Sequence, residues 1–252
     1  MTSARTDDDA ISVWLVPVRG GVGGIPVRAE RLLDDEERTA LARLRREIDR
    51  AQYLTVHVAR RLLVSGRLGI EPEEVAFAPT ACPLCGAMHG RPALDGLAGV
   101  LDVSISRTAG VVAIALAEAT VGVDVETVEA RVKADDLGAA LHPSELADLA
   151  NLPSDQRDLA ALRCWARKEA VLKGIGTGLG IEPSTIEVGV GRSPRPAGSV
   201  ATRDGVVDVG EWTVVDLDAG GEAVAALAHA GPRTTTVVVR RIELGELLAI
   251  AG

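Results

Sequence analysis

Lysine, aromatic residues and cysteine are all scarce in this 252-residue chain. Only three of its 27 basic residues are lysines, so nearly every positive charge is an arginine. Aromatic residues make up 2% of the chain, and we therefore expect a core of valine, leucine, isoleucine and alanine. Three cysteines are too few for a disulfide framework and suit the reducing cytoplasm, which is the location we expect.

Long apolar runs and an excess of positive charge are absent as well. The sequence has no run of about 18 apolar residues, which predicts no membrane span, and its acidic start predicts no secretory signal. The net charge of −9 argues against a general nucleic-acid binder. A hydrophobic content of 47% with 25% charged residues is typical of a globular protein, which here has the length of one large domain or two ordinary ones.

The order of apolar runs and amphipathic segments predicts an α/β fold. Strands are expected over residues 11–18, 75–78, 100–106, 110–117, 121–126, 211–217, 223–230 and 234–240. Helices are expected over residues 34–50 and 51–69, from Pro143, and from Ser154 or Asp155 to about Lys173.

The later strands resemble the earlier ones weakly. Residues 223–240 repeat the run–turn–run pattern of residues 110–126, and residues 211–217 resemble residues 11–18. We therefore expect two related halves, an N-terminal one over residues 1–120 and a C-terminal one over residues 121–252. A chance likeness between Val- and Ala-rich segments is the alternative.

Two of the three lysines lie five residues apart, around a glutamate, in "CWARKEAVLKGIGTGL" (164–179). Trp165, Glu169 and Lys173 are spaced four apart, so they share one helix face, and Lys168 lies beside it. A Glu–Lys pair on a solvated helix face would have the same spacing.

The stretch "VGVDVE" (121–126) adds two acids. Asp124 and Glu126 alternate with valines on a predicted strand, so both carboxylates point the same way. Neighbouring acids on one face repel each other unless a cation lies between them, although the solvent side of a strand would show the same alternation. With one carboxylate from a packed helix they would offer oxygen ligands to a divalent cation such as Mg²⁺, beside a lysine that holds phosphate.

Together, "GVDVE" and "WARKEAVLKGIGTGL" resemble the signature of 4′-phosphopantetheinyl transferases of the large, surfactin-synthetase-activating type. The matching positions are Gly122, Asp124, Glu126, Trp165, Lys168, Glu169, Lys173, Gly176, Gly178 and Leu179. The resemblance implies two pseudo-symmetric α/β halves with coenzyme A in the cleft between them. It also implies Mg²⁺ held by Asp124, Glu126 and Glu169 together with the pyrophosphate of coenzyme A.

The activity implied by the resemblance is transfer of the 4′-phosphopantetheine arm of coenzyme A to a serine of an acyl or peptidyl carrier protein, which releases adenosine 3′,5′-bisphosphate. The large type favours carriers of polyketide or non-ribosomal peptide synthesis. Lys168 and Lys173 would neutralise phosphate, and Lys173 would stabilise or protonate the leaving group. Glu169 would be the general base, directly or through a metal-bound water.

Further coenzyme contacts follow from the same resemblance. "HGRP" (89–92) is similar to a G-[KR]-P element, which implies contacts from Arg91 and Pro92, although a solvated loop arginine is the alternative. "SISRTAG" (104–110) is similar to a second element, in which an arginine here replaces the usual histidine. The contacts implied there are Ser106, Arg107 and Thr108. Candidates for the 3′-phosphate are Arg46, Arg50 and Arg60, while Gln52 stands where the key arginine is expected.

The expected partners are coenzyme A and carrier proteins, with neither nucleic acid nor membrane. Because both halves of the cleft lie in one chain, we expect a monomer. Carrier proteins are acidic near their serine and this chain is acidic too, so we expect a small apolar docking surface near residues 143–150 and 151–163, edged by arginines.

Cys82, Cys85 and His89 form a CxxC with a histidine, which offers three of the four ligands of a zinc site. A plain tight loop is the interpretation we favour, and a redox pair is a third possibility.

Two rival functions remain. One is another Mg²⁺-dependent phosphoryl-transfer or nucleotide-hydrolysing enzyme, which would not need the lysine pair. The other is a carrier-binding module with a decayed site. The presence of all three acids and both lysines argues against this alternative.

Overall fold

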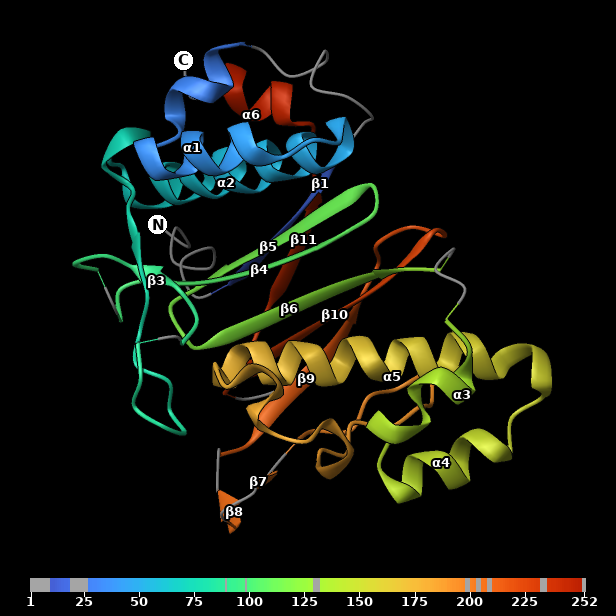
Figure 1. Cartoon of the computed structure of the whole chain (residues 1–252). Coiled ribbons are helices and arrows are strands. Elements are labelled where there is room, and N and C mark those ends of the chain that lie inside the picture. The colour runs from blue at the N-terminus through green and yellow to red at the C-terminus, as the bar shows by residue number, and fades with distance from the viewer. Residues whose placement is uncertain are drawn as a thin grey trace, which may run out of the picture.

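The computed structural model describes residues 10–18, 27–88, 90–97, 99–128, 132–197, 200–202, 205–207, 210–231 and 235–250. These residues form four layers (Figure 1). A group of helices covers the outer face of one sheet, a second sheet lies against its inner face, and a long helix covers the second sheet from below. The prediction of a mixed α/β fold is confirmed.

The two main sheets contain seven strands. The first has the order β11-β1-β5-β4 and the second has the order β6-β10-β9. Paired neighbours are antiparallel except β1 and β11, which are parallel. The strands are β1 (Ile11–Pro17), β4 (Asp102–Thr108), β5 (Val111–Ala117), β6 (Val121–Thr127), β9 (Trp212–Leu217), β10 (Ala223–Ala230) and β11 (Val237–Arg241). Two small hairpins pair β2 (Phe77–Ala78) with β3 (Ala93–Leu94) and β7 (Val200–Thr202) with β8 (Gly205–Val207).

The helices of the described residues are α1 (Asp35–Arg43), α2 (Glu47–Leu68), α3 (Ala134–Leu137), α4 (Pro143–Ala150), α5 (Ser154–Ile175) and α6 (Leu244–Ile250). Helix α4 begins at the predicted proline, and Gly176, with φ 82°, caps the C-terminal end of α5. Within the described residues, no helix is long and apolar enough to cross a bilayer.

The prediction of one helix over residues 34–50 is wrong. Helix α1 ends at Arg43, Leu44 is extended with φ −74° and ψ 128°, and α2 begins at Glu47. The break lets α1 fold back beside α2, where the carboxylate of Glu37 accepts hydrogen bonds from α2 side chains. A tertiary contact therefore overrides the continuous helical pattern of the sequence.

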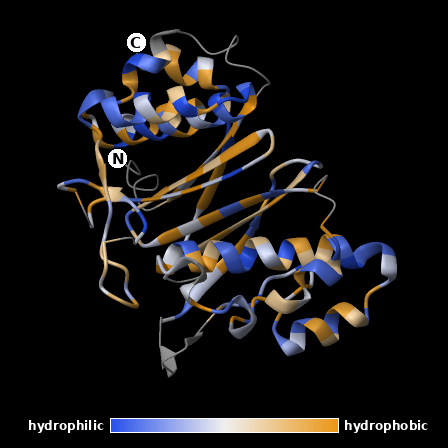
Figure 2. Ribbon diagram, in the orientation of Figure 1, coloured by the Kyte–Doolittle hydropathy of each residue, from blue (hydrophilic) through white to orange (hydrophobic). Residues whose placement is uncertain are grey.

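Three apolar clusters separate the layers, and each is dominated by Val, Leu, Ile and Ala (Figure 2). The middle cluster lies between the sheets and includes Val13, Ala115, Val123 and Leu227, none of which is exposed. Trp212 is the only aromatic side chain among the fully buried apolar residues of the described part. The prediction of an aliphatic core is thus confirmed.

The order of elements repeats once along the chain. Each half consists of a strand, a 22-residue helix and a hairpin, in the orders β1-α2-β4-β5 and β6-α5-β9-β10, and in each the first strand pairs with the last. The expected likeness of residues 211–217 to 11–18 is wrong, because β9 takes the place of β4 rather than of β1. Strand β11 pairs with β1 and helix α6 contacts α2. Residues 237–250 therefore pack against the N-terminal half, although the expected C-terminal half, residues 121–252, included them.

His229 of β10 is a titratable side chain buried in the fold. It is 1% exposed, and its Nε2 has no hydrogen-bond partner among the described residues. Burial lowers the pKa of His229, and the nearby carbonyl of Ala230 only partly opposes this effect. The imidazole is therefore neutral in the folded protein near neutral pH.

We expect His229 to make the fold acid-sensitive. Its folded pKa lies below the ordinary value near 6.5, so stability is complete above about pH 6.5 and is lost as the pH falls through the folded pKa. Urea unfolding at about pH 7.5 and 5.5 would measure this for the wild type and His229→Leu. The variant should lose less stability on acidification, and an equal loss in both proteins would contradict the assignment.

Candidate active site

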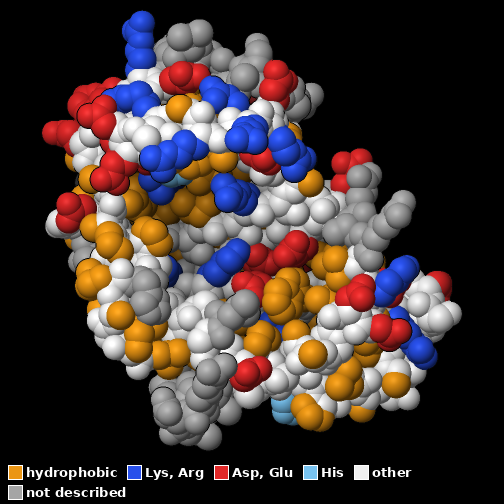
Figure 3. Space-filling view, in the orientation of Figure 1, with side chains coloured by type: hydrophobic (Ala, Val, Ile, Leu, Met, Phe, Trp, Pro, Cys, Tyr) orange, Lys and Arg blue, Asp and Glu red, His pale blue; other side chains and the backbone are white. Residues whose placement is uncertain are grey.

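A cavity of about 630 Å³ opens between α2, β4 and the end of α5. Figure 3 shows the molecule hollowed between its two helical layers, with Asp and Glu side chains gathered in the hollow and Lys and Arg side chains along its upper rim. The lining residues are Val56, Arg60, Phe77, Gly90, Arg91, Pro92, Val103, Ser104, Ile105, Ser106, Arg107, Lys173, Gly176, Thr177 and Gly178.

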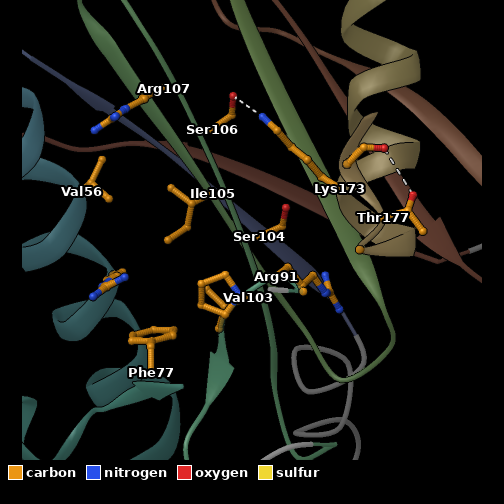
Figure 4. Close-up of a pocket in the computed structure, with 15 residues that line it drawn as sticks. Val56, Phe77, Arg91, Val103, Ser104, Ile105, Ser106, Arg107, Lys173 and Thr177 are labelled. Atoms are coloured by element: carbon orange, nitrogen blue, oxygen red, sulfur yellow. Dashed lines mark hydrogen bonds between the residues drawn. The ribbon is translucent and has the colours of Figure 1, made fainter. Parts of the chain in front are cut away.

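Strand β4 divides its side chains between two neighbours. Val103, Ile105 and Arg107 point toward α2, whereas Ser104 and Ser106 point toward β6 and Lys173 (Figure 4). This alternation is the ordinary period of a strand. As a result, β4 presents two apolar side chains and one arginine toward α2, and two serine hydroxyl groups toward β6.

Polar side chains of β4, rather than a backbone ladder, join the two sheets at the floor of the hollow. Asp102 accepts a hydrogen bond from the backbone N–H of Val121 at 2.7 Å, and Ser104 Oγ accepts one from Val123 at 2.9 Å. Farther along, Ser106 Oγ donates to Asp124 Oδ1 at 2.8 Å. The first sheet thus fixes the position of β6 at the residues that precede its two acids.

Two glycines bring α5 directly onto β6. A Cβ at Gly122 would lie 1.9 Å from the carbonyl oxygen of Ala170, and a Cβ at Gly174 would lie 2.3 Å from the ring of Trp212. Neither position has room for a side chain. Helix and strand therefore touch through their backbones, which places the helix residue next to Gly174, Lys173, over the strand.

Asp124 is the centre of the polar cluster. Its Oδ1 accepts hydrogen bonds from Lys173 Nζ at 2.6 Å and from Ser106 Oγ at 2.8 Å, and Lys173 also donates to Ser106 at 2.8 Å. The Asp124 side chain is only 3% exposed, while that of Lys173 is 30% exposed toward the cavity. Asp124 Oδ2 is buried and has no hydrogen-bond partner among the described residues.

Glu126 and Glu169 lie close enough to Asp124 to feel its charge. Burial raises the pKa of Glu126, and the charge of Asp124 raises it further, while a hydrogen bond from Trp165 Nε1 at 3.2 Å acts in the opposite direction. Burial and Asp124 also raise the pKa of Glu169, which Lys173 partly offsets. The structure therefore gathers the predicted acids and Lys173 into one electrostatic unit.

The side chains of this cluster have the chemistry that a hard divalent cation prefers, although not the spacing of a closed metal site. Carboxylate oxygens are the ligands that Mg²⁺ prefers, and the unpartnered Oδ2 of Asp124 lacks the cation or donor that a buried carboxylate oxygen requires. Within the described residues, no three Cys, His, Asp or Glu side chains are grouped closely enough to hold a metal ion by themselves. Lys173 is the cation that contacts Asp124 in this arrangement.

Lys168 does not lie where the sequence placed it, and its predicted phosphate contact is wrong for this structure. Its side chain is fully buried, and Nζ lies 2.7 Å from Oε2 of the equally buried Glu145 of α4. It also donates to the carbonyls of Pro183 and Ile186. Although Lys168 precedes Glu169 in sequence, a helix turns about 100° per residue, so the two side chains face different neighbours.

Glu145 completes this buried pair. It accepts backbone N–H groups from Val188 at 2.7 Å and from Gly189 at 2.9 Å. Burial alone would raise the pKa of Glu145, but the hydrogen bond and charge of Lys168 lower it below its ordinary value. Lys168 and Glu145 together bind the backbone of residues 183–189, which follow α5, and so hold that segment against α4 and α5. This is a structural role.

The remaining predicted contacts divide into two groups. Pro92, Ser106 and Arg107 line the cavity, and so does Arg91. However, Arg91 Nη2 also donates to both carboxylate oxygens of Asp102 at 2.6 Å, and its Nη1 donates to the carbonyl of Val121 at 2.8 Å. Arg91 therefore also holds the seam between the sheets.

Two predicted contacts, Arg50 and Thr108, are not among the lining residues. Arg50 donates to the carbonyl of Leu41, and Thr108 Oγ1 lies 3.4 Å from Thr127 Oγ1. Gln52 donates to the Thr108 carbonyl at 2.8 Å, so it too has a partner within the protein.

Sequence reasoning missed Phe77, whose ring lies under the guanidinium of Arg60 at 4.3 Å. The available signal was its rarity, because Phe77 is the only phenylalanine in a chain with 2% aromatic residues. It also missed Asp102 and Glu145, for which no local pattern gave a signal.

The cysteine loop forms a tight turn. Cys82 donates its N–H to Ala87 O, and Gly86 donates its N–H to Cys82 O, both at 2.8 Å. Hydrogen bonds from the backbone N–H groups of Cys85 and Leu84 lower the pKa of the Cys82 thiol. His89, the third ligand of the suggested zinc site, lies outside the described residues.

Breaking the buried Lys168–Glu145 pair should strongly destabilise the fold. Lys168→Met leaves the Glu145 carboxylate buried without its cation, so we expect the free energy of unfolding to fall by about 3–5 kcal/mol. Lys133→Met is the matched control, because Lys133 pairs with Asp158 at 2.9 Å on the exposed surface. Urea unfolding should show little change in the control, and similar losses in both variants would contradict the structural role of Lys168.

Comparison with known proteins gives a consistent result. Residues 120–228 match the sequence model of the 4′-phosphopantetheinyl transferase superfamily, a range that includes the acids and Lys173. The 4′-phosphopantetheinyl transferase HetI of Nostoc sp. is 26% identical over 229 residues, which cover 88% of this chain and 89% of HetI. A Synechocystis sp. protein, slr0495, whose name assigns it provisionally to the same enzyme class, is 27% identical over 172 residues, which cover 66% of this chain and 65% of that protein.

Proposed function

We propose that this chain is a 4′-phosphopantetheinyl transferase, as its match to that superfamily over residues 120–228 and its likeness to HetI support. In this proposal the cavity binds coenzyme A, and Asp124, Glu126, Glu169 and Lys173 carry out the transfer of the phosphopantetheine arm to a carrier-protein serine. One observation carries the proposal: a buried aspartate with an unpartnered oxygen lies beside the lysine that lines the cavity. Such a pair suits a reaction in which a cation and an anion must both be held.

The proposed metal ligands are Asp124, Glu126 and Glu169. Their oxygen atoms suit a cation, and burial and the charge of Asp124 raise the pKa of both glutamates, which a bound cation would oppose. Bound there, Mg²⁺ would supply positive charge against the pyrophosphate of coenzyme A. Trp165 fixes one of the ligands, because its indole N–H donates to Glu126 Oε1.

Lys173 is proposed to stabilise the leaving phosphate. Its ammonium already lies at the border between Asp124 and the cavity, and its side chain keeps 30% of its surface exposed. Ser106 orients it through a hydrogen bond of 2.8 Å. A compact ammonium in that position neutralises charge that grows on a phosphate oxygen as the bond breaks.

Glu169 is the proposed acceptor of the serine proton. A carboxylate with a raised pKa is a stronger base than an ordinary glutamate, and burial beside Asp124 raises the pKa of Glu169. Glu169 therefore has a double role in the proposal, as metal ligand and as the group toward which the serine proton moves, directly or through water.

The rest of the cavity would hold the body of coenzyme A. Arg60 and Arg107 line it with positive charge, and Phe77, Val103 and Ile105 line it with apolar surface (Figure 4). A nucleotide joined to a pantetheine arm has the same mixture of phosphates and apolar parts. We also propose that catalysis is monomeric, because all of these residues belong to one chain.

The carrier is proposed to dock beside α4 and the start of α5. Leu146 and Leu159 are exposed there, at 42% and 39%, which supports the expected apolar contact. Arg157 lies in the same segment, although it already donates to the carbonyls of Leu152 and Ala150. Carriers of polyketide or non-ribosomal peptide synthesis remain the proposed substrates.

The proposed function predicts that an apo carrier protein gains the mass of phosphopantetheine when it is incubated with this chain, coenzyme A and Mg²⁺. Asp124→Asn, which keeps the shape of the side chain but removes its charge, should abolish the gain, and EDTA should do the same. Mass spectrometry of the carrier checks all three reactions. Full transfer by Asp124→Asn or in EDTA would remove the metal from the proposal, and hydrolysis of coenzyme A without transfer would favour the rival enzyme class.

Lys173→Ala should lower turnover more than it weakens coenzyme A binding. The proposed role is to meet charge that develops in the transition state, so we expect a loss in kcat of roughly 100-fold or more with a much smaller rise in KM for coenzyme A. Arg107→Ala is the comparison, because Arg107 also lines the cavity but points toward α2, away from Lys173 (Figure 4). A Lys173→Ala enzyme with normal kcat and a raised KM would show that Lys173 only binds the substrate.

A further inference from the structure

We infer that Glu37, which lies outside the cavity, is a positioning residue that holds Arg60 in place for coenzyme A. The inference rests on the proposed function, because it requires coenzyme A to occupy the cavity. Arg60 of α2 lines that cavity, whereas Glu37 of α1 does not. The proposed effect of Glu37 on the substrate therefore passes through the guanidinium of Arg60.

Glu37 gathers three side chains of α2 on one carboxylate. Its Oε1 lies 2.6 Å from His57 Nδ1, 2.5 Å from Arg60 Nη2 and 2.8 Å from Arg61 Nη1. Tyr53 stacks on the His57 ring with a centroid separation of 4.0 Å and an interplanar angle of 21°. Because the Glu37 side chain is only 7% exposed, water competes little for these hydrogen bonds.

The cluster keeps Glu37 ionised. Burial alone would raise the pKa of Glu37, but hydrogen bonds from His57 and Arg61 hold it well below its ordinary value. Burial and the charge of Arg60 lower the pKa of His57, so its ring is neutral near pH 7 and donates from Nδ1. Arg61 has a second partner in Asp34, at 3.2 Å, whereas Glu37 is the one carboxylate paired with Arg60 among the described residues.

The guanidinium of Arg60 is held at two points and, within the part of the chain that the structure describes, lacks a hydrogen-bond partner at a third. Its Nη2 is held by Glu37, and its guanidinium lies over the Phe77 ring at 4.3 Å. Its Nε is buried and has no acceptor among the described residues. A buried donor without an acceptor is unfavourable, so we expect a molecule bound against Arg60, which lines the cavity, to complete the bonding of its guanidinium. Coenzyme A offers such acceptors in its phosphates and its adenine ring.

The α2 end of the cavity, where Arg60 lies, is on the opposite side from the residues proposed to take part in the transfer. Val56 and Phe77 lie on the side of α2, across the cavity from Lys173 and Ser106 (Figure 4). A group held there is far from the bond that breaks, and its contacts are the same in the ground state and the transition state. Loss of such contacts weakens binding without slowing the bound complex.

The test is Glu37→Gln, which keeps the side-chain length but removes the charge. We expect the Kd for coenzyme A, measured by calorimetry, to rise about tenfold, as for one weakened charge-assisted hydrogen bond, while kcat stays within about twofold of the wild type. In an Arg60→Ala background, adding Glu37→Gln should leave the Kd unchanged, because the residue through which Glu37 acts is already gone.

Asp34→Ala is the matched control. It removes the cap of α1 and one partner of Arg61, but it leaves the Arg60 contact to Glu37 in place. It should lower the unfolding midpoint without changing the Kd for coenzyme A. If Glu37→Gln does not fold, Glu37→Asp, which keeps the charge but shortens the reach, is expected to show the same rise in Kd with normal kcat.

Three outcomes would overturn the inference: wild-type Kd in the folded Glu37 variant, an equal loss of affinity in the Arg60→Ala background, or a raised Kd in Asp34→Ala. The failure of the proposed function has a different signature. A wild-type protein that binds coenzyme A but transfers nothing to a carrier contradicts the enzyme assignment, and the calorimetric comparison still decides the role of Glu37. A wild type that does not bind coenzyme A contradicts both.

Discussion

The close approach of β6 and α5 is the constraint on which the polar cluster depends. At Gly122 a Cβ would come 1.9 Å from the carbonyl of Ala170, so any side chain there would push the helix away from the strand. With the helix at backbone contact, Lys173 reaches Asp124 at 2.6 Å, two residues beyond the glycine. The glycines and the charged residues of the two sequence motifs therefore belong to one geometry, since the charges meet only if the glycines allow the contact.

A second constraint is the seam between the sheets, which is built from side chains. Asp102 and Ser104 bind the backbone of β6, and Ser106 continues the same row but binds a carboxylate instead. A single alternating strand thus fixes the position of β6 and also contributes to the cluster. Because Arg91 braces Asp102, the loop that borders the cavity is tied to the same seam.

The features that could be predicted from the sequence are those that depend on residues close together in the chain. The strand period placed Asp124 and Glu126 on one face, and the helix period placed Glu169 and Lys173 together, because both periods are local. Motif likeness then indicated the family that we propose. The assignment of Lys168 failed because its partner, Glu145, comes from another helix, and no periodicity reports a tertiary partner. The break between α1 and α2 escaped prediction for the same reason, since it serves a contact between the helices.

The unpartnered buried atoms of the described residues show how the hollow is completed. Arg60 Nε is a donor at the α2 end, Asp124 Oδ2 is an acceptor beside Lys173, and the third such atom, His229 Nε2, belongs to β10 and not to the cavity lining. A site that lacks an acceptor at one end and a cation at the other suits an anion that arrives with a metal ion. The net charge of −9 would otherwise repel such an anion at long range, so the basic rim over α2 provides the favourable approach (Figure 3).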